Sequence, residues 1–262
     1  MKDRLEASPS GGGAGDGRAG RRLGTALFVV FGLAAFAVLL GLGTWQVQRL
    51  HWKEGLIATI DARIAAAPEP LAAIEARLAA TGDVDYWPVT LAGSFRHAGE
   101  RHFFATHKGL SGYFVFTPLA LDDGRLILVN RGFVPFDRKD AATRPQGQVE
   151  GRQEIAGLAR NRVEGKPNAL MPDNDPEKNI FYWKDLDAMA ASAGVGAPGD
   201  YLPFFVDADD APNPGGLPVG GVTLIEMPNS HLQYAVTWYG LATALAGVMG
   251  VWLWRRWRPP AG

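Results

Sequence analysis

The sequence predicts an α+β protein in which two transmembrane helices, one near each end of the chain, flank one domain with an antiparallel sheet and a few helices. Two apolar blocks predict the helices: Leu23–Trp45 and Tyr234–Trp254 contain no charged side chain. A helix needs about 20 such residues to cross the hydrocarbon core of a bilayer. Between the blocks, short segments rich in β-forming residues alternate with Gly, Pro and Asp, as in an antiparallel sheet.

Basic residues predict the orientation of the two helices. Arginines precede the first apolar block and follow the second: Arg18, Arg21, Arg22, Arg255, Arg256 and Arg258. No Lys or Arg occurs between Lys184 and Arg255. The positive-inside rule therefore places both termini in the cytoplasm and the central domain in the periplasm.

The predicted location is the bacterial inner membrane, crossed twice. The acidic residues Asp3, Glu6 and Asp16 argue against a mitochondrial transit peptide. A cleaved signal peptide is the alternative for the first block, because Ala35 and Ala37 give an A-x-A pattern. Apolar sequence continues through Leu42, however, where a mature chain should turn polar.

The predicted organisation has five parts. They are a disordered cytoplasmic tail (1–22), the first transmembrane helix (23–45), a periplasmic α+β domain (46–233), the second transmembrane helix (234–254) and a cytoplasmic tail (255–262).

Within the central domain, periodicity predicts both helices and strands. His51–Ala66 places Leu56, Ile60 and Ile64 on one stripe of an amphipathic helix, and Leu71–Ala80 forms a second helix. A third, short helix is expected over 185–192. The expected strands are 87–91, 101–105, 113–116, 125–129, 149–158, 202–206 and Gly221–Glu226.

Composition excludes several classes of function. The chain has no cysteine, so it has no disulfide, thiolate metal site or Cys nucleophile. Its formal net charge of −1 gives no basic field to attract nucleic acid.

Three motifs that resemble functional sites are better explained as structure. Gly194–Gly199 matches G-x-G-x-x-G but follows a predicted helix rather than a strand, so it is expected to be a loop. His97, His102 and His107 recur every five residues, a spacing that gathers imidazoles on neither a strand nor a helix. The run Pro172–Pro176 is typical of a turn.

Four motifs, one of which contains the Pro172–Pro176 run, resemble a known family. They are Gly43–Arg49 with Lys53, Val129–Pro135, Pro172–Pro176 with Trp183 and Asp185, and Asn229–Ala235 with Trp238. In this order they are similar to the Surfeit-locus family of cytochrome c oxidase assembly factors, over roughly 22–258 and with matching topology.

The resemblance implies an assembly factor rather than an enzyme. It implies a chaperone role in respiratory-chain biogenesis, with haem a as a transient cargo that is delivered to or inserted into oxidase subunit I. The implied partners are that subunit, the haem a synthesis enzyme and the lipid bilayer. A scaffold that stabilises oxidase subunits without touching haem is the alternative.

His231 is the residue that physical argument singles out as a haem ligand. Ser230 and Gln233 fit a capping box, which puts His231 in the first turn of the second helix at the outer membrane boundary. The positive end of a helix disfavours imidazolium. Neutral imidazole is the form that ligates haem iron.

The other candidate cofactor-binding residues surround this position. His231, Tyr234, Ala235 and Trp238 fall on one helical face, where a flat macrocycle could lie. Trp45, Arg49 and Lys53 lie at the end of the first helix, and the two cations could pair with propionates.

Each of these residues also has a structural explanation. His231 would then be an interfacial side chain, Trp45 and Trp238 belt aromatics, and Arg49 a snorkelling anchor. Arg131 and Gly132 in the second motif are explained in the same way, as a strand end and a turn, rather than as a partner-binding site.

Close packing of the two membrane helices is a further expectation. Ala242, Ala246 and Gly250 form a strip of small residues, and Ala37 and Gly41 form a matching pair on the first helix.

Overall fold

A computed structural model describes residues 16–223 and 227–258 of the chain. It divides into two compact units. The helix unit comprises Met1–Ile57 and Met227–Gly262, and the barrel unit comprises Ala58–Glu226.

The helix unit contains two long helices, α1 (Asp16–Ile64) and α4 (His231–Trp257), of which α1 continues into the barrel unit. Both are long and apolar enough to cross a membrane. Only 6% and 11% of their most apolar windows are buried, unlike core helices of soluble proteins, which agrees with a membrane protein. The rise of about 1.5 Å per residue makes the 49 residues of α1 far longer than a bilayer core is thick.

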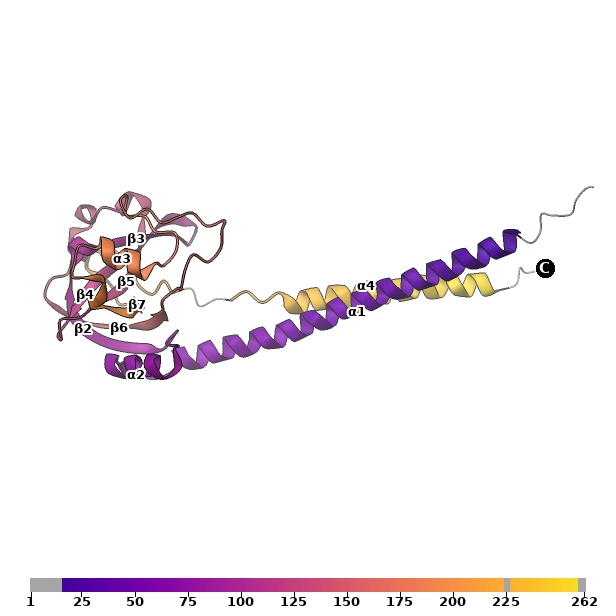
Figure 1. Cartoon of the computed structure of the whole chain (residues 1–262), viewed down its shortest axis with the longest axis horizontal. Coiled ribbons are helices and arrows are strands. Elements are labelled where there is room, and N and C mark those ends of the chain that lie inside the picture. Colours follow the sequence, from indigo (N-terminus) through magenta and orange to yellow (C-terminus); the bar gives the residue numbers. More distant parts are fainter. Residues whose placement is uncertain (1–15, 224–226, 259–262) are drawn as a thin grey trace, which may run out of the picture. The chain divides into compact units, whose positions relative to one another are not determined.

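The two helices run antiparallel and pack on each other (Figure 1). Gly32 of α1 faces the side chain of Met249, and a Cβ built on Gly43 would come within 2.8 Å of the Tyr239 ring. The Thr44 hydroxyl lies 3.1 Å from the Tyr239 hydroxyl. Small residues on α1 therefore receive large side chains from α4, as in close packing within lipid.

The contact seam follows alternating steps of four and three residues. On α4 its members are His231, Ala235, Trp238, Ala242, Leu245, Met249 and Trp252; on α1 they include Gly32, Phe36, Leu39, Gly43, Gln46, Leu50 and Lys53. This spacing averages 3.5 residues per turn, the pattern of a left-handed coiled coil.

The expected pairing of the helices is confirmed. The prediction of the residues that mediate it is wrong for all but Ala242. Ala242 is 1% exposed, whereas Ala246 and Gly250 are exposed, as are Ala37 and Gly41. Steps of four drift by about 40° each around a helix, so a strip spaced i, i+4, i+8 leaves the seam that steps of four and three follow.

In the barrel unit one sheet closes on itself. The strands are β1 (Glu69–Pro70), β2 (Pro88–Phe95), β3 (Arg101–His107), β4 (Leu110–Leu121), β5 (Leu126–Pro135), β6 (Arg152–Asn161) and β7 (Tyr201–Ala208). Their order is β1-β2-β6-β7-β5-β4-β3, and β2 also pairs with β4 through Gly93–Phe95. A Cβ on Gly93 would collide with the Ala120 carbonyl, so glycine permits the two strands to close the barrel at this point.

Two apolar clusters stabilise this unit. The barrel interior holds one, which includes Val89, Ile127, Phe204 and Val206, and α2 (Leu71–Thr81) adds Ile74 to it. The other lies around α3 (Leu186–Ser192) and includes Phe116, Phe181, Met189 and Phe205. Short 3₁₀ helices complete the unit: His97–Gly99, Phe136–Arg138, Ala141–Thr143, Pro145–Gly147, Pro198–Asp200 and Pro214–Gly216.

The expected antiparallel sheet is mixed instead. Five pairings are antiparallel, but β1 pairs with β2 and β5 pairs with β7 in parallel. A parallel pair needs a long crossover, and the chain from Pro135 to Tyr201, which includes β6 and α3, supplies it.

Other expectations are corrected at element ends. The helix expected at His51–Ala66 is the continuation of α1, and α1 begins at Asp16, inside the segment expected to be a disordered tail. Residues 221–223 of the strand expected at Gly221–Glu226 are not in a strand, and its remainder lies outside the described residues.

Gly132, in the second family motif, marks a close approach of two backbones. Its φ is +123°, and a Cβ there would collide with the Val219 carbonyl. Phe133 and Val219 exchange two backbone hydrogen bonds of 2.8 Å beside it. Only glycine therefore permits the backbone at Val219 to pair with β5 at this point. The sequence predicted a simple turn at Gly132 instead.

Candidate functional site

The candidate site of the helix unit is a polar pair inside an apolar seam. His231 is the first residue of α4, and its Nδ1 lies 2.7 Å from Oε1 of Gln46 on α1. Gln46 is 9% exposed and His231 is half-buried. An amide oxygen accepts hydrogen bonds, so the imidazole Nδ1 donates to it, and in the neutral form of the ring Nε2 carries the lone pair.

The capping box expected at this helix start is not formed. The Ser230 side chain makes no capping hydrogen bond, and Gln233 is exposed. The Asn229 side chain accepts a long hydrogen bond of 3.4 Å from the His231 backbone instead. Asn229 therefore binds the backbone N–H of His231, and Gln46 binds its imidazole ring.

The expected haem-facing surface of α4 is divided between two sides of the helix. Ala235 is 2% exposed and lies in the seam, while Tyr234 is 52% exposed and Trp238 is half-buried. A macrocycle could not lie flat on Ala235 without separating the helices.

The candidate residues of α1 have different surroundings from one another. Lys53 lies in the seam and donates a hydrogen bond to the Pro228 carbonyl, just before α4. Arg49 is exposed, with its guanidinium 4.3 Å from the centre of the Trp52 ring. Trp45 is 51% exposed. The structure thus brings Lys53 close to the beginning of α4 and leaves Trp45 and Arg49 free at the surface of the helix pair.

Helical geometry turns the exposed candidates toward one side of the pair. A step of one residue turns by about 100°, and the two helices run in opposite directions. Trp45 and Arg49 are rotated about the axis of α1 in the same sense relative to the seam residue Gln46. Tyr234 is rotated relative to His231 on α4 so that it points to the same side of the helix pair. The rings of Phe28 and Trp252 meet on that side too, with centroids 4.3 Å apart.

Gln46 was missed as a site residue, although it lies within the first family motif. A polar side chain at a seam position of an otherwise apolar helix is a signal that could have found it. The expected strip of small residues concealed this signal, because it placed the seam on another face.

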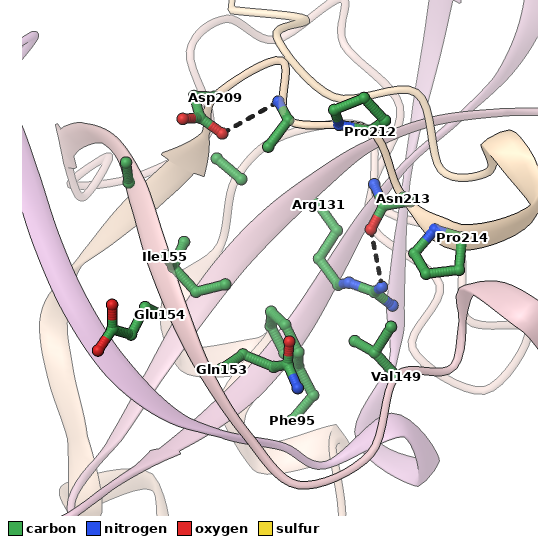
Figure 2. A pocket seen from close by; sticks show the side chains of 13 residues that line it. Phe95, Arg131, Val149, Gln153, Glu154, Ile155, Asp209, Pro212, Asn213 and Pro214 are labelled. Atoms are coloured by element: carbon green, nitrogen blue, oxygen red, sulfur yellow. Dashed lines mark hydrogen bonds between the residues drawn. The ribbon is translucent and has the colours of Figure 1, made fainter.

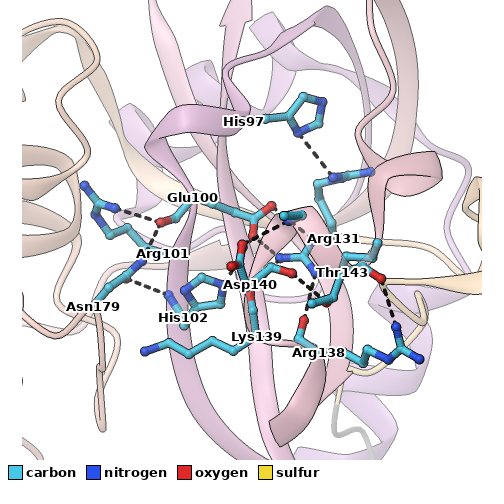
Figure 3. A network of polar contacts seen from close by, with 12 residues as sticks. His97, Glu100, Arg101, His102, Arg131, Arg138, Lys139, Asp140, Thr143 and Asn179 are labelled. Carbon is cyan, nitrogen blue, oxygen red and sulfur yellow. Dashed lines mark hydrogen bonds and ion pairs between the residues drawn. The ribbon is translucent and has the colours of Figure 1, made fainter.

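The barrel unit contains a buried charge network that the sequence did not predict (Figure 3). Arg144 donates two hydrogen bonds to the Glu100 carboxylate, and the two side chains are 2% and 5% exposed. His102 Nε2 lies 3.2 Å from the same carboxylate. Arg144 also donates to the Arg138 and Lys139 carbonyls, so the network fastens the 136–147 segment to β3.

The three histidines of this unit do not meet at a metal site. His97 contacts the Val149 carbonyl, His102 contacts Glu100, and the His107 ring lies 5.3 Å from that of Phe133. Across residues 16–223 and 227–258 no cluster of three or more potential ligands occurs. The turn expected at Pro172–Pro176 lies further along the chain, at residues 176–179 between the paired Asp175 and Ile180. Of the loop expected at Gly194–Gly199, residues 194–197 are a loop after α3, and Pro198 begins a short 3₁₀ helix.

Comparison with known proteins identifies the family. The model of the SURF1 family matches residues 33–243. Surfeit locus protein 1 of Rattus norvegicus is 40% identical over 237 residues, 84% of this chain and 72% of the relative. The human Surfeit locus protein 1 is 40% identical over 221 residues, covering 78% and 70%. A SURF1-like protein of Monosiga brevicollis is 38% identical over 237 residues, 86% of each chain. This chain therefore belongs to the SURF1 family.

Proposed function

We propose that this protein is a cytochrome c oxidase assembly factor that binds haem a through His231 at the outer membrane face and aids its insertion into oxidase subunit I. Membership of the SURF1 family supports the role in assembly. The Gln46–His231 pair supports the binding site and is the observation that carries the proposal.

The pair has the chemistry of a haem ligand. Histidines that bind metals usually donate their other ring N–H to an acceptor, which fixes the tautomer and the ring orientation. Gln46 Oε1 is that acceptor, which leaves Nε2 of His231 as the lone-pair donor. Nε2 has no hydrogen-bond partner within the described residues. A single imidazole suits a cargo that must be released, because it supplies one axial ligand and no closed cage.

The exposed side of the helix pair fits the rest of a macrocycle. Tyr234 and Trp45 offer aromatic surface there, and Arg49 offers a guanidinium for a propionate. Lys53, which is engaged by Pro228, would instead hold the beginning of α4 in place. Ala235 and Trp238 stay in the seam, so the porphyrin would rest beside the helix pair rather than between its members.

His231→Ala is expected to remove most of the haem a that copurifies with the protein, because it deletes the iron ligand. Gln46→Leu is expected to reduce haem content less and to broaden the imidazole-iron absorption bands, because the ring loses its orienting acceptor. In the haem-free protein, the ¹⁵N NMR signals of His231 should shift from the Nδ1–H tautomer toward a mixture in Gln46→Leu. The measurements are the visible spectrum of protein from cells that make haem a, and NMR of haem-free protein in detergent.

His51→Ala is the matched control, because His51 is an exposed histidine near the same end of α1. It should leave haem content and spectrum unchanged. Full haem occupancy with an unchanged spectrum in His231→Ala would exclude His231 as the ligand. A wild-type protein without haem, although haem a is abundant, would favour the scaffold that never touches haem.

We also propose that both termini lie in the cytoplasm of a bacterium and the barrel unit in the periplasm, on the grounds of the arginine flanks. A periplasm-active reporter should work when inserted near residue 140, in the exposed part of the 136–147 segment. The same reporter fused after residue 262 should be inactive. Activity at residue 262 would contradict this topology.

A further inference from the structure

Arg131 on β5 is a buried cation without a carboxylate partner. It is 2% exposed, and no ion pair to it is found in the described part of the chain. The nearby carboxylate of Glu100 is hydrogen-bonded by Arg144, so its single charge acts on two arginines and forms an ion pair with only one of them. Burial lowers the pKa of Arg131 to about 10, which still leaves the guanidinium charged at neutral pH.

The hydrogen bonds of Arg131 use only part of its guanidinium. Nη2 donates to the Gly147 carbonyl and, over 3.1 Å, to Oδ1 of Asn213. Nη1 has a long contact of 3.5 Å with His97 Nδ1, and Nε has no partner among the described residues. A guanidinium carries five N–H donors, so some of those of Arg131 have no acceptor in the described part of the protein.

The other two side chains that contact the guanidinium, Phe95 and His97, are neutral. The Phe95 ring lies 4.7 Å from its central carbon. Burial and the charge of Arg131 keep the pKa of His97 below its ordinary value, so this ring is neutral at pH 7. None of these contacts balances the positive charge, which is the usual requirement for a buried arginine.

A pocket of about 260 Å³ opens beside this side chain. Its lining includes Arg131, Phe95, Val149, Gln153, Asn213 and Pro214 (Figure 2). Two carboxylates, Glu154 and Asp209, also line the pocket, but both are exposed. Asp209 accepts a hydrogen bond of 3.1 Å from the Ala211 backbone (Figure 2), and neither carboxylate forms an ion pair with Arg131 in the described part of the chain. The guanidinium is therefore the one cation among the lining residues of this pocket, while the side-chain amides of Gln153 and Asn213 donate to the Glu150 and Pro218 carbonyls.

We infer that this pocket binds a carboxylate group, which accepts hydrogen bonds from the free N–H groups of Arg131. A carboxylate matches the flat fork of a guanidinium, and it would supply the charge that the protein itself does not. The carboxylate could belong to a small metabolite or to the end of a protein chain. This inference rests on the barrel unit alone and does not depend on haem binding.

Sodium acetate is the probe for the shared chemistry. We expect acetate, titrated against sodium chloride at equal ionic strength, to shift the ¹⁵Nε signal of Arg131 saturably in the full-length protein in detergent. Arg131→Gln should remove this signal and weaken acetate binding, followed on the signals of neighbouring residues, by about tenfold or more. Arg138→Gln, which removes a half-exposed arginine from the 136–147 segment, should bind acetate as wild type does.

A second variant decides the matter if Arg131→Gln does not fold. Ala211 is exposed and lines the pocket, so Ala211→Trp should block access while leaving the guanidinium and the barrel intact. Acetate should then no longer shift the Arg131 signal. An undiminished, saturable shift in Ala211→Trp, or no saturable shift in the wild type, would overturn the inference.

Two peptides separate the sources of the carboxylate. A short glycine peptide with a free C-terminus that binds more tightly than acetate would identify a protein chain end as the ligand. Weaker binding of that peptide than of acetate would identify a small carboxylate. Equal binding of the peptide and its C-terminal amide would contradict carboxylate recognition altogether.

Discussion

Glu100→Gln is expected to destabilise the barrel unit by about 3–5 kcal/mol. The substitution keeps the size of the side chain but removes its charge, and Arg144 then stays buried without a counter-ion. It also loosens the 136–147 segment, which Arg144 fastens to β3. Thermal unfolding of the full-length protein in detergent, followed by circular dichroism of the β signal, measures the loss.

Two further variants test the cause of this loss. Asp122→Asn breaks the ion pair between Asp122 and Arg152, whose side chains are 66% and 54% exposed, and should change stability little. Glu100→Gln combined with Arg144→Met removes both buried charges, and it should be less destabilised than Glu100→Gln alone. A double variant that is less stable than the single one would show that packing, not charge, holds this segment.

The same network makes stability depend on pH. Burial alone would raise the pKa of Glu100, but hydrogen bonds from His102 and Arg144 hold it below its ordinary value of 4.5. A carboxyl whose pKa is lowered by folding stabilises the protein above its unfolded pKa. This contribution is lost as pH falls below 4.5 and through the folded pKa. Glu100→Gln should remove this part of the acid sensitivity.

Ala242→Leu is expected to disrupt the pairing of α1 and α4 and to lower both the amount of protein in the membrane and its haem content. Ala242 is 1% exposed and lies in the seam, so a larger side chain would force the helices apart. Ala246→Leu is the matched control, because Ala246 is exposed one turn further along α4. It should behave as wild type in membrane accumulation and in the visible spectrum.

The contrast between these two alanines is the decisive result. Equal losses in Ala242→Leu and Ala246→Leu would mean that the seam follows the strip of small residues after all. Unchanged accumulation and haem content in Ala242→Leu would mean that close packing at this position is not needed. Cysteine cross-linking is a direct second measurement, since the chain has no native cysteine to interfere. Gly32→Cys with Met249→Cys should cross-link, because the two residues face each other.

The elements of this protein were largely predictable because they depend on local sequence. Uncharged blocks gave both long helices, and β-rich segments between glycines and prolines gave six of the seven strands. The end of α1 was not predictable from hydropathy, because a membrane boundary changes polarity without requiring the helix to stop. The parallel β5–β7 pair was not predictable either, since it depends on a long crossover rather than on the strands themselves.

The candidate site was predictable in part. His231 follows from its place at a helix start beside an apolar block, but its partner Gln46 depends on how two distant helices pack. Local capping rules predicted a bond from Ser230, and the structure forms one from Asn229 instead, because both side chains were available within two residues. The same holds for Arg131. The sequence shows that it lies in a family motif, but only the folded chain shows that it has no counter-ion.

The Gln46–His231 bond also fixes the register of the two helices. If α4 slid by seven residues along α1, the imidazole would face Leu39 or Lys53 in place of Gln46. Either shift would separate the imidazole from its amide acceptor and leave the buried Gln46 side chain without this hydrogen bond, at a cost of about 1–3 kcal/mol. An apolar seam alone would tolerate such sliding far better. The position of His231 along α1 is therefore set by a polar contact within the chain itself.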